Sequence, residues 1–307
     1  MKATRTFTRY AWFVLGYLLL VILWGAWVRI SGSGAGCGAH WPTCNGEVIP
    51  LDPTLATLIE YTHRLTSGLS LPLVLILVVW SFKRFSPGEG VRKAVMGTLF
   101  FLLTEAALGA GLVKFELVAG NTSVARAITA SFHLVNTFAL TGFAALTAWW
   151  SRPHTPATDF NIKRNRATGL LFPAMIALLL SSMAGAITAL GDTLFPTSVF
   201  TEQGLIAHVA EQVSASTHFL VQLRIVHPVI ALLTSIYLLI TLPLIDGFTR
   251  HKHLINAVVV FQVALGFLNI LLHAPTVMQL SHLFTALVLW LSVLLLWVKT
   301  QSVKESS

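Results

Sequence analysis

The chain has 307 residues, of which 55% are hydrophobic and 10% are charged, and its formal net charge is +8. A soluble domain of this length needs more charged residues to cover its surface, so the composition excludes an ordinary soluble enzyme and indicates a chain embedded in lipid. The positive charge does not indicate a nucleic-acid partner, because the basic residues gather at the ends of apolar segments.

Eight apolar segments are long enough to cross a bilayer. In chain order they cover residues 12–30, 54–82, 93–113, 124–150, 169–190, 217–245, 254–273 and 276–298. Every backbone amide inside the hydrocarbon must be bonded within the chain, so these segments are predicted to be helices rather than open strands. We therefore expect an all-α integral membrane protein with eight transmembrane helices.

The basic residues predict how these helices are oriented. All but five of the 20 lysines and arginines lie in the two tails or in the loops near 83–93, 152–166 and 250–252. Eight helices place these regions on one side of the membrane, which the positive-inside rule identifies as the cytoplasm. The N-terminal tail is short and no clear cleavage site follows the first segment, so we expect neither a cleaved signal peptide nor a mitochondrial presequence. The predicted location is a prokaryotic plasma membrane, with both termini cytoplasmic.

Two halves are predicted, residues 1–150 and 169–307, joined by a polar cytoplasmic linker at 151–168. The tripeptide Ala-Leu-Gly occurs at 107–109 and again at 264–266, and each copy is followed one helix later by a histidine, His133 or His282. We interpret this pattern as a tandem repeat of two pseudo-symmetric four-helix bundles that enter the membrane in the same orientation.

Four histidines lie inside predicted helices, two in each half: His63, His133, His227 and His282. Each follows the start of its helix by roughly 7–10 residues, a depth of about 10–15 Å. One such histidine could be a packing residue, but four at one depth indicate function, because a polar ring in lipid is costly. Paired histidines on neighbouring helices can ligate haem iron, whereas zinc normally needs three or four ligands. The pattern therefore predicts one haem per half, with these histidines as axial ligands of the iron.

Four arginines border the predicted outer ends of the helices: Arg29, Arg64, Arg126 and Arg224. Haem carries two propionates, and guanidinium groups suit carboxylates. The alternative is that these arginines merely extend to the membrane interface. Because the positive-inside rule disfavours arginine on the outer side, we expect Arg224 to bind propionates in the C-terminal half and the other three to bind them in the N-terminal half.

Glu60 precedes His63 by three residues and therefore lies on nearly the same helix face. A carboxylate there could take a proton or stabilise positive charge on a substrate carbon beside the first haem, which makes Glu60 the catalytic candidate. Arg224 holds the matching position before His227, so we infer that the first half does chemistry and the second holds a permanent cofactor. The alternative is that Glu60 is an ion-pair partner of a nearby arginine. Glu105 is a weaker candidate without an identifiable partner.

Cys37 and Cys44 are the two cysteines of the chain and lie in a segment expected to face the outside, where oxidation is permitted. Gly38 and Pro42 between them allow a tight bridge. We expect a disulfide and leave its role, structural or redox-active, open. Two cysteines cannot ligate an iron–sulfur cluster alone.

Three segments form long, specific motifs: 25–37 (GAWVRISGSGAGC), 41–44 (WPTC) and 60–65 (EYTHRL). They resemble the first-helix end, outer loop and second-helix motif of the haem A synthase family, and the repeat and the four histidines extend the likeness over essentially the whole chain. Three features depart from the family pattern. The predicted outer loop at 191–216 lacks the second cysteine pair of many relatives, and Pro228 rather than an arginine follows His227. Ala39 and His40 stand where an acidic residue or proline is common before the Trp-Pro pair.

The resemblance implies that haem O is the substrate, bound in the N-terminal half, and that one methyl group of its porphyrin is oxidised to a formyl group. The product would be haem A for terminal oxidases. It also implies a haem b cofactor in the C-terminal half. Haem O synthase and an unidentified electron donor are candidate partners besides membrane lipid. The oxygen source and the oligomeric state, with a homo-oligomer as one option, stay open.

Other functions share some of these features. A non-catalytic diheme cytochrome b-like electron carrier would use the four histidines but would need neither Glu60 nor the cysteine loop, and a transporter would use the histidines as proton relays. The farnesyl-transferring haem O synthase needs paired aspartates for magnesium and diphosphate, but the aspartates of this chain stand singly: Asp52, Asp159, Asp192 and Asp246.

Overall fold

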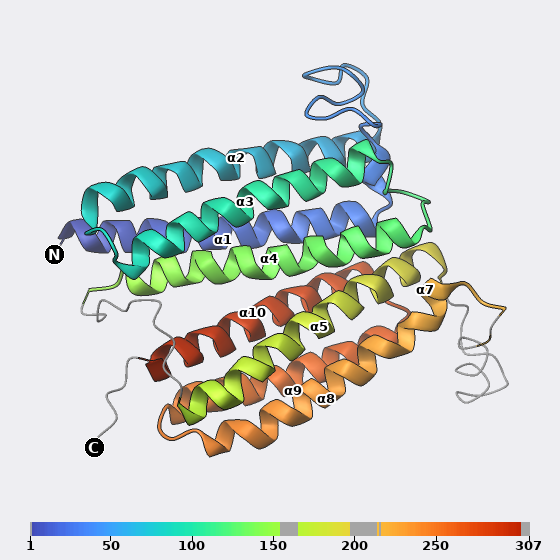
Figure 1. Ribbon diagram of the computed structural model, residues 1–307. Coiled ribbons are helices and arrows are strands. Elements are labelled where there is room, and N and C mark those ends of the chain that lie inside the picture. Colours follow the sequence, from blue (N-terminus) through green and yellow to red (C-terminus); the bar gives the residue numbers. More distant parts are fainter. Residues whose placement is uncertain (1, 154–164, 197–213, 215, 302–307) are drawn as a thin grey trace.

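The computed structural model describes residues 2–153, 165–196, 214 and 216–301. Over these residues the protein consists of helices and loops, with one isolated β-bridge between Cys44 and Glu47. The long helices lie side by side (Figure 1), with α1–α4 on one side of the molecule and α5, α8, α9 and α10 on the other. The α-helices are α1 Lys2–Ile30, α2 Leu55–Arg84, α3 Gly90–Lys114, α4 Val124–Trp150, α5 Arg166–Leu194, α7 Phe219–Gln222, α8 Val226–Thr241, α9 Thr249–Leu271 and α10 Thr276–Gln301. The 3-10 helices are η1 Ser33–Ala35, η2 Leu223–Ile225 and η3 Leu242–Leu244.

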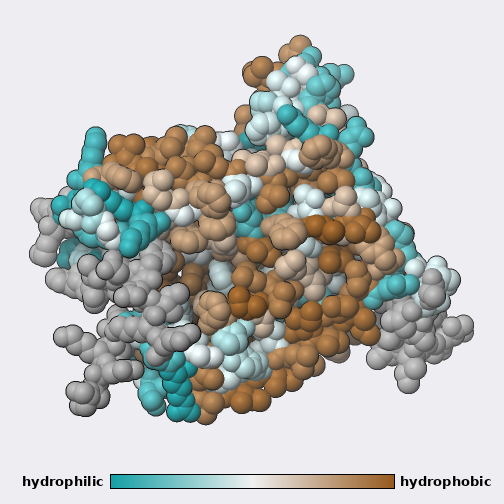
Figure 2. All heavy atoms as spheres, in the orientation of Figure 1, coloured by the Kyte–Doolittle hydropathy of each residue, from teal (hydrophilic) through white to brown (hydrophobic). Residues whose placement is uncertain are grey.

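Eight segments of the described chain are long and apolar enough to span a membrane. On the face shown in Figure 2, apolar residues cover most of the middle of the molecule, and polar residues gather toward both ends of the helices. The predicted all-α, multi-pass membrane architecture is therefore confirmed.

The first helix starts earlier than predicted. The sequence placed its apolar part from residue 12, but α1 begins at Lys2. These first turns of α1 pack against the rest of the protein. Phe7 and Ala11 are buried, and the Thr8 hydroxyl donates a hydrogen bond of 2.8 Å to the Ser151 carbonyl after α4. A contact with a residue so distant in sequence extends the helix, and hydropathy alone does not reveal it.

The sixth span is broken into four pieces, α7, η2, α8 and η3, where one helix was predicted. Pro228 has no N–H, so it cannot bond the carbonyl of Arg224 four residues earlier. The Thr188 hydroxyl of α5 donates to that carbonyl instead, at 3.4 Å. Thus the carbonyl that Pro228 leaves without its usual donor is bonded by the neighbouring helix α5.

The fifth helix begins at Arg166, three residues before the predicted boundary at 169. The side chain of Asn165 caps it by accepting a hydrogen bond of 2.8 Å from the Thr168 amide. Most of the predicted linker (154–164) and much of the predicted outer loop (197–213) lie outside the described residues.

The helices α4 and α10 lie at the centre of the molecule, and half of each apolar window is buried. The Trp290 indole on α10 donates a hydrogen bond of 2.8 Å to the Phe138 carbonyl on α4, and the two rings lie 5.8 Å apart. The four helices α2, α4, α8 and α10 share a direction, running from the end of the molecule that carries the cysteine loop (Figure 1). We call this end the disulfide end.

Candidate functional site

The four intramembrane histidines lie on α2, α4, α8 and α10, each within about three turns of the start of its span. All four therefore lie toward the disulfide end. His227 is the second residue of α8, directly after the break, and is followed by Pro228. The structure thus brings the sequence-predicted histidines to one end of the membrane-spanning region.

The C-terminal pair, His227 and His282, face each other. Their ring centroids lie 6.1 Å apart with an interplanar angle of 89°. The Nδ1 atom of His227 lies 3.0 Å from the Ser181 carbonyl. A carbonyl can only accept, so this contact places the ring proton on Nδ1 and leaves Nε2 with its lone pair.

His282 has a different neighbour. The Gln262 side-chain amide on α9 donates to Nε2 of His282 and to its backbone carbonyl, each at 3.2 Å. Because Gln262 has the carbonyl as a second acceptor, it can keep one bond when another group takes the Nε2 lone pair. The Nδ1 atom of His282 is buried without a hydrogen-bond partner in the described structure.

The N-terminal pair, His63 and His133, lie close enough to interact electrostatically. The Nδ1 atoms of both rings are buried and lack a hydrogen-bond partner among the residues that the structure covers. Nδ1 of His133 lies 3.4 Å from Oε1 of Glu105 on α3. Buried polar atoms are nearly always hydrogen-bonded, so these Nδ1 atoms are exceptions, and Nδ1 of His133 has a candidate acceptor nearby in Glu105.

The sequence indicated Glu105 only as a weaker candidate without an identifiable partner. Its carboxylate accepts hydrogen bonds from the Thr137 hydroxyl at 2.6 Å and from the Asn136 amide at 2.5 Å, both on α4. One signal could have found it: Glu105 and Gln262 each stand two residues before the Ala-Leu-Gly tripeptide, each one helix before a histidine.

Three glycines face three of the histidine rings. A Cβ atom on Gly25 of α1 would lie 2.9 Å from Cε1 of His63, one on Gly185 of α5 would lie 3.1 Å from Cε1 of His227, and one on Gly266 of α9 would lie 3.2 Å from Cε1 of His282. Ordinary side-chain contacts are longer than these distances. Glycines on the neighbouring helices therefore make room for the rings. The pattern of histidines in the sequence did not reveal this role of the glycines.

These residues fit haem better than a bare metal ion. Among the described residues, no group of three or more histidine, cysteine, aspartate or glutamate side chains could hold a metal ion. Metal–imidazole bonds are about 2 Å long, so His227 and His282, whose ring centroids lie 6.1 Å apart, would be able to hold one iron atom together. A planar cofactor supplies the remaining ligands of its own metal, so two histidines are sufficient.

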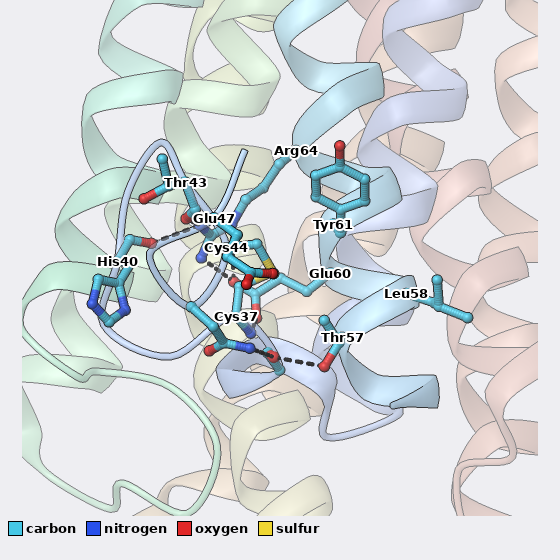
Figure 3. Close-up of a disulfide and its surroundings, with 12 residues drawn as sticks. Cys37, His40, Thr43, Cys44, Glu47, Thr57, Leu58, Glu60, Tyr61 and Arg64 are labelled. Atoms are coloured by element: carbon cyan, nitrogen blue, oxygen red, sulfur yellow. Dashed lines mark hydrogen bonds and ion pairs between the residues drawn. A yellow bond between two sulfur atoms is a disulfide. The ribbon is translucent and has the colours of Figure 1, made fainter. Parts of the chain in front are cut away.

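Glu60 is tied to the cysteine loop (Figure 3). Its Oε2 atom accepts a hydrogen bond of 2.9 Å from the Cys37 amide, and its Oε1 atom pairs with Arg64 at 2.5 Å. Arg64 in turn donates to the carbonyls of His40 and Thr43, each at 2.6 Å. The ion pair weighed as the structural alternative is therefore present, and the catalytic role stays a prediction.

The expected disulfide is confirmed. Cys37 and Cys44 are bonded, with an S–S distance of 2.03 Å, and both are fully buried. The Thr57 hydroxyl of α2 donates to the Gly36 carbonyl at 2.8 Å, beside the Glu60 contact. Helix α2 thus holds the cross-linked loop through Thr57 and Glu60 (Figure 3).

Arg29 bonds groups of the other half of the chain. It donates to the Ala189 carbonyl and the Thr193 hydroxyl on α5, each at 2.8 Å, and to Oε1 of Gln279 on α10 at 3.1 Å. It also interacts electrostatically with Asp192 and Arg126.

Arg126 and Arg224 use part of their donors locally. Arg126 donates to the carbonyls of Ala119 and Asn121. Arg224 pairs with Asp192 at 3.0 Å and donates to the carbonyls of Gly191 and Phe195. Propionate binding by the four arginines stays a prediction.

Comparison with known proteins gives two kinds of match. The model of the COX15-CtaA family, described as cytochrome oxidase assembly protein, matches residues 8–294. Proteins named protoheme IX farnesyltransferase from two strains of Thermus thermophilus are 43% identical over 293 residues, which is 92% of this chain and 46% of each relative. Proteins named heme A synthase from Alkalihalophilus pseudofirmus and Shouchella clausii are 42% and 43% identical over 98 residues, about a third of each chain. The chain thus spans less than half the length of the Thermus relatives.

Proposed function

Because the chain belongs to the family of cytochrome oxidase assembly proteins, we propose that it is a haem A synthase, which oxidises one porphyrin methyl group of haem O to a formyl group. The observation that carries this proposal is the arrangement of the two histidine pairs. The rings of His227 and His282 lie 6.1 Å apart, and those of His63 and His133 lie close enough to interact electrostatically. Glycines of adjoining helices leave space beside three of the four rings. The relatives named heme A synthase add support, although each covers about a third of this chain.

The two pairs have different proposed roles. His63 and His133 hold the substrate, haem O, and His227 and His282 hold a haem b. When bound, that haem b supplies one-electron transfer. The Ser181 carbonyl keeps the Nε2 lone pair of His227 free for iron, as outer-shell partners of metal-bound histidines do.

Glu60 is the proposed catalytic carboxylate. It is buried, and its oxygens accept from Arg64 and from the Cys37 amide. These donors hold the carboxylate one turn from His63, where it can accept a proton released during oxidation of a carbon beside the porphyrin ring. The propionates of the substrate haem are proposed to bind Arg29 and Arg126. These two positive charges lie near each other at the disulfide end.

The second candidate is a diheme electron carrier, and one observation favours it. Both Glu60 oxygens already have protein partners, as expected if the residue only fastens the cysteine loop. Farnesyl transfer, the activity in the name of the Thermus relatives, is not proposed. This chain covers 46% of those proteins, and its four aspartates form no pair in the sequence.

We further propose that the two halves are pseudo-symmetric bundles in a prokaryotic plasma membrane, with both termini in the cytoplasm and the disulfide outside. The start of α1 and the end of α10 lie at one end of the molecule, opposite the cysteine loop (Figure 1). The positive-inside pattern supports this orientation. Haem O synthase and an electron donor are the proposed partners.

The test is chromatography of haems extracted from cells that make haem O together with each variant. We expect the wild type to yield formylated haem, and Glu60→Gln to keep bound haem while product falls by about 10²–10⁴-fold. The control is Glu116→Gln, an exposed glutamate in the loop after α3, which should leave the yield unchanged. Wild-type product from Glu60→Gln contradicts the catalytic role, and haem without any formylated product from the wild type favours the electron carrier.

A further inference from the structure

Glu105 stands within a membrane-spanning helix and is oriented by α4. Thr137 and Asn136 follow His133 by four and three residues, so all three side chains lie on one face of α4. Both donate to the Glu105 carboxylate, at 2.6 and 2.5 Å. Asn136 is itself fixed by Thr104, whose hydroxyl donates to its Oδ1 atom at 2.6 Å.

Besides these two donors, the described structure places Nδ1 of the His133 ring 3.4 Å from Oε1 of Glu105. A carboxylate away from water is stable only with donors around it. Two neutral donors and one ring nitrogen are what this site provides. A small rotation of the ring completes a hydrogen bond from Nδ1–H to Oε1, and Nδ1 of His133 has no other partner in the described chain.

The corresponding residue in the C-terminal half contacts the other ring nitrogen of its histidine. Gln262 stands at the same distance from its Ala-Leu-Gly tripeptide, and its amide donates toward Nε2 of His282. Glu105 instead offers an acceptor to Nδ1 of His133. The carboxylate can keep the His133 proton on Nδ1, whereas the Gln262 amide competes for the lone pair that would bind iron.

We propose that Glu105 is a positioning residue of the N-terminal site. Its carboxylate accepts Nδ1–H of His133, fixes the ring and its tautomer, and directs the Nε2 lone pair to the iron of the substrate haem. Such outer-shell carboxylates also raise the basicity of the ligand. This inference rests on the proposed function for the identity of the group bound by His133, but the tautomer itself does not depend on it.

The experiment compares the wild type, Glu105→Gln and Gln262→Glu as purified full-length proteins. Ferric haem b is the probe for occupancy, and the midpoint potentials of the two bound haems are followed separately by their spectra. For Glu105→Gln we expect haem affinity at the N-terminal site to fall about 10–100-fold and its midpoint potential to rise, while the C-terminal haem is unchanged. For Gln262→Glu we expect the potential of the C-terminal haem to fall.

A second readout needs no haem. Histidine-selective ¹⁵N NMR of the haem-free protein, with the His133 signal identified by its absence in His133→Ala, reports which nitrogen carries the proton. An Nδ1–H tautomer in the wild type that is lost in Glu105→Gln supports the inference. An Nε2–H tautomer in the wild type overturns it, as do equal losses of both haems in Glu105→Gln. If the wild type binds no haem at the N-terminal pair, the proposed function is wrong, and the tautomer still decides the role of Glu105.

Discussion

At the position of Gly25, the His63 ring leaves room for hydrogen alone. Helix propensity would favour alanine at this point of α1, but its Cβ atom would lie 2.9 Å from the ring. Gly185 and Gly266 likewise leave room for a histidine ring at positions where alanine would favour the helix. At this scale the site is shaped by the absence of side chains as much as by the histidines.

We predict that Gly25→Ala displaces the His63 ring and lowers haem affinity at the N-terminal site by about 10–100-fold, as changes beside a metal ligand do. Binding at the C-terminal pair should not change. The measurement is titration with haem b followed by absorption spectra. Gly16→Ala, on the same helix with no atom within 4 Å of the added Cβ, is the matched control. Equal affinity for Gly25→Ala and Gly16→Ala would show that the ring is free to move.

At the scale of the elements, α3 and α4 pack unusually closely at Gly97. An added Cβ atom there would overlap the Phe143 ring, which stacks on Phe101 of α3 with centroids 5.3 Å apart. Close approach at a small residue is typical of helix pairs in membranes, where lipid provides no hydrophobic drive to bring helices together.

We predict that Gly97→Ala destabilises the protein by about 1–3 kcal/mol through overpacking. Thermal unfolding in detergent would measure the effect. Gly109→Ala on the same helix, where the added Cβ meets nothing within 4 Å, should not lower the stability of the haem-free protein. Phe143→Leu should restore part of the loss in Gly97→Ala, and the absence of any rescue would contradict the proposed clash.

The helices themselves could be predicted from the sequence because long apolar runs must satisfy their backbones internally. The histidines could be predicted because polar rings are rare in such runs. Their partners could not. Glu105 reaches His133 from another helix, and Arg29 bonds α5 and α10. The early start of α1 likewise depends on the contact between Thr8 and Ser151. These interactions join residues far apart in the chain, so hydropathy and helix periodicity do not encode them, although the repeated Ala-Leu-Gly tripeptide offered a signal for Glu105.

At the scale of the whole molecule, contacts at both ends and at the centre join the two groups of helices. Arg29 bridges to Thr193 at the disulfide end. The Trp290 indole bonds the Phe138 carbonyl between the two central helices. At the opposite end, the Lys299 ammonium lies 5.0 Å from the centre of the Trp149 ring.

We predict that Trp290→Phe lowers stability by about 1 kcal/mol, the usual net value of one buried hydrogen bond. Trp297, on the same helix, is the matched comparison, because its indole nitrogen is buried without a partner in the described structure. Trp297→Phe removes an unsatisfied polar group and should be neutral or stabilising. Thermal unfolding of both variants provides the measurement, and a larger loss for Trp297→Phe would contradict this account of the central contact.

The polar face of α4 also bears on how the newly made chain enters the bilayer. Its span has a mean hydropathy of 1.2, against 1.7 to 2.2 for the other seven, and Arg126, His133 and Asn136 lie within it. Polar side chains inside the hydrocarbon are costly unless protein groups bond them, and His133 and Asn136 lie deeper in α4 than its first turn, so α4 is poorly suited to leave the translocon alone. Its neighbour α3 arrives first and carries Glu105, which meets Asn136. Insertion of α3 and α4 together, as a hairpin, lets each helix satisfy the polar groups of the other before either meets lipid.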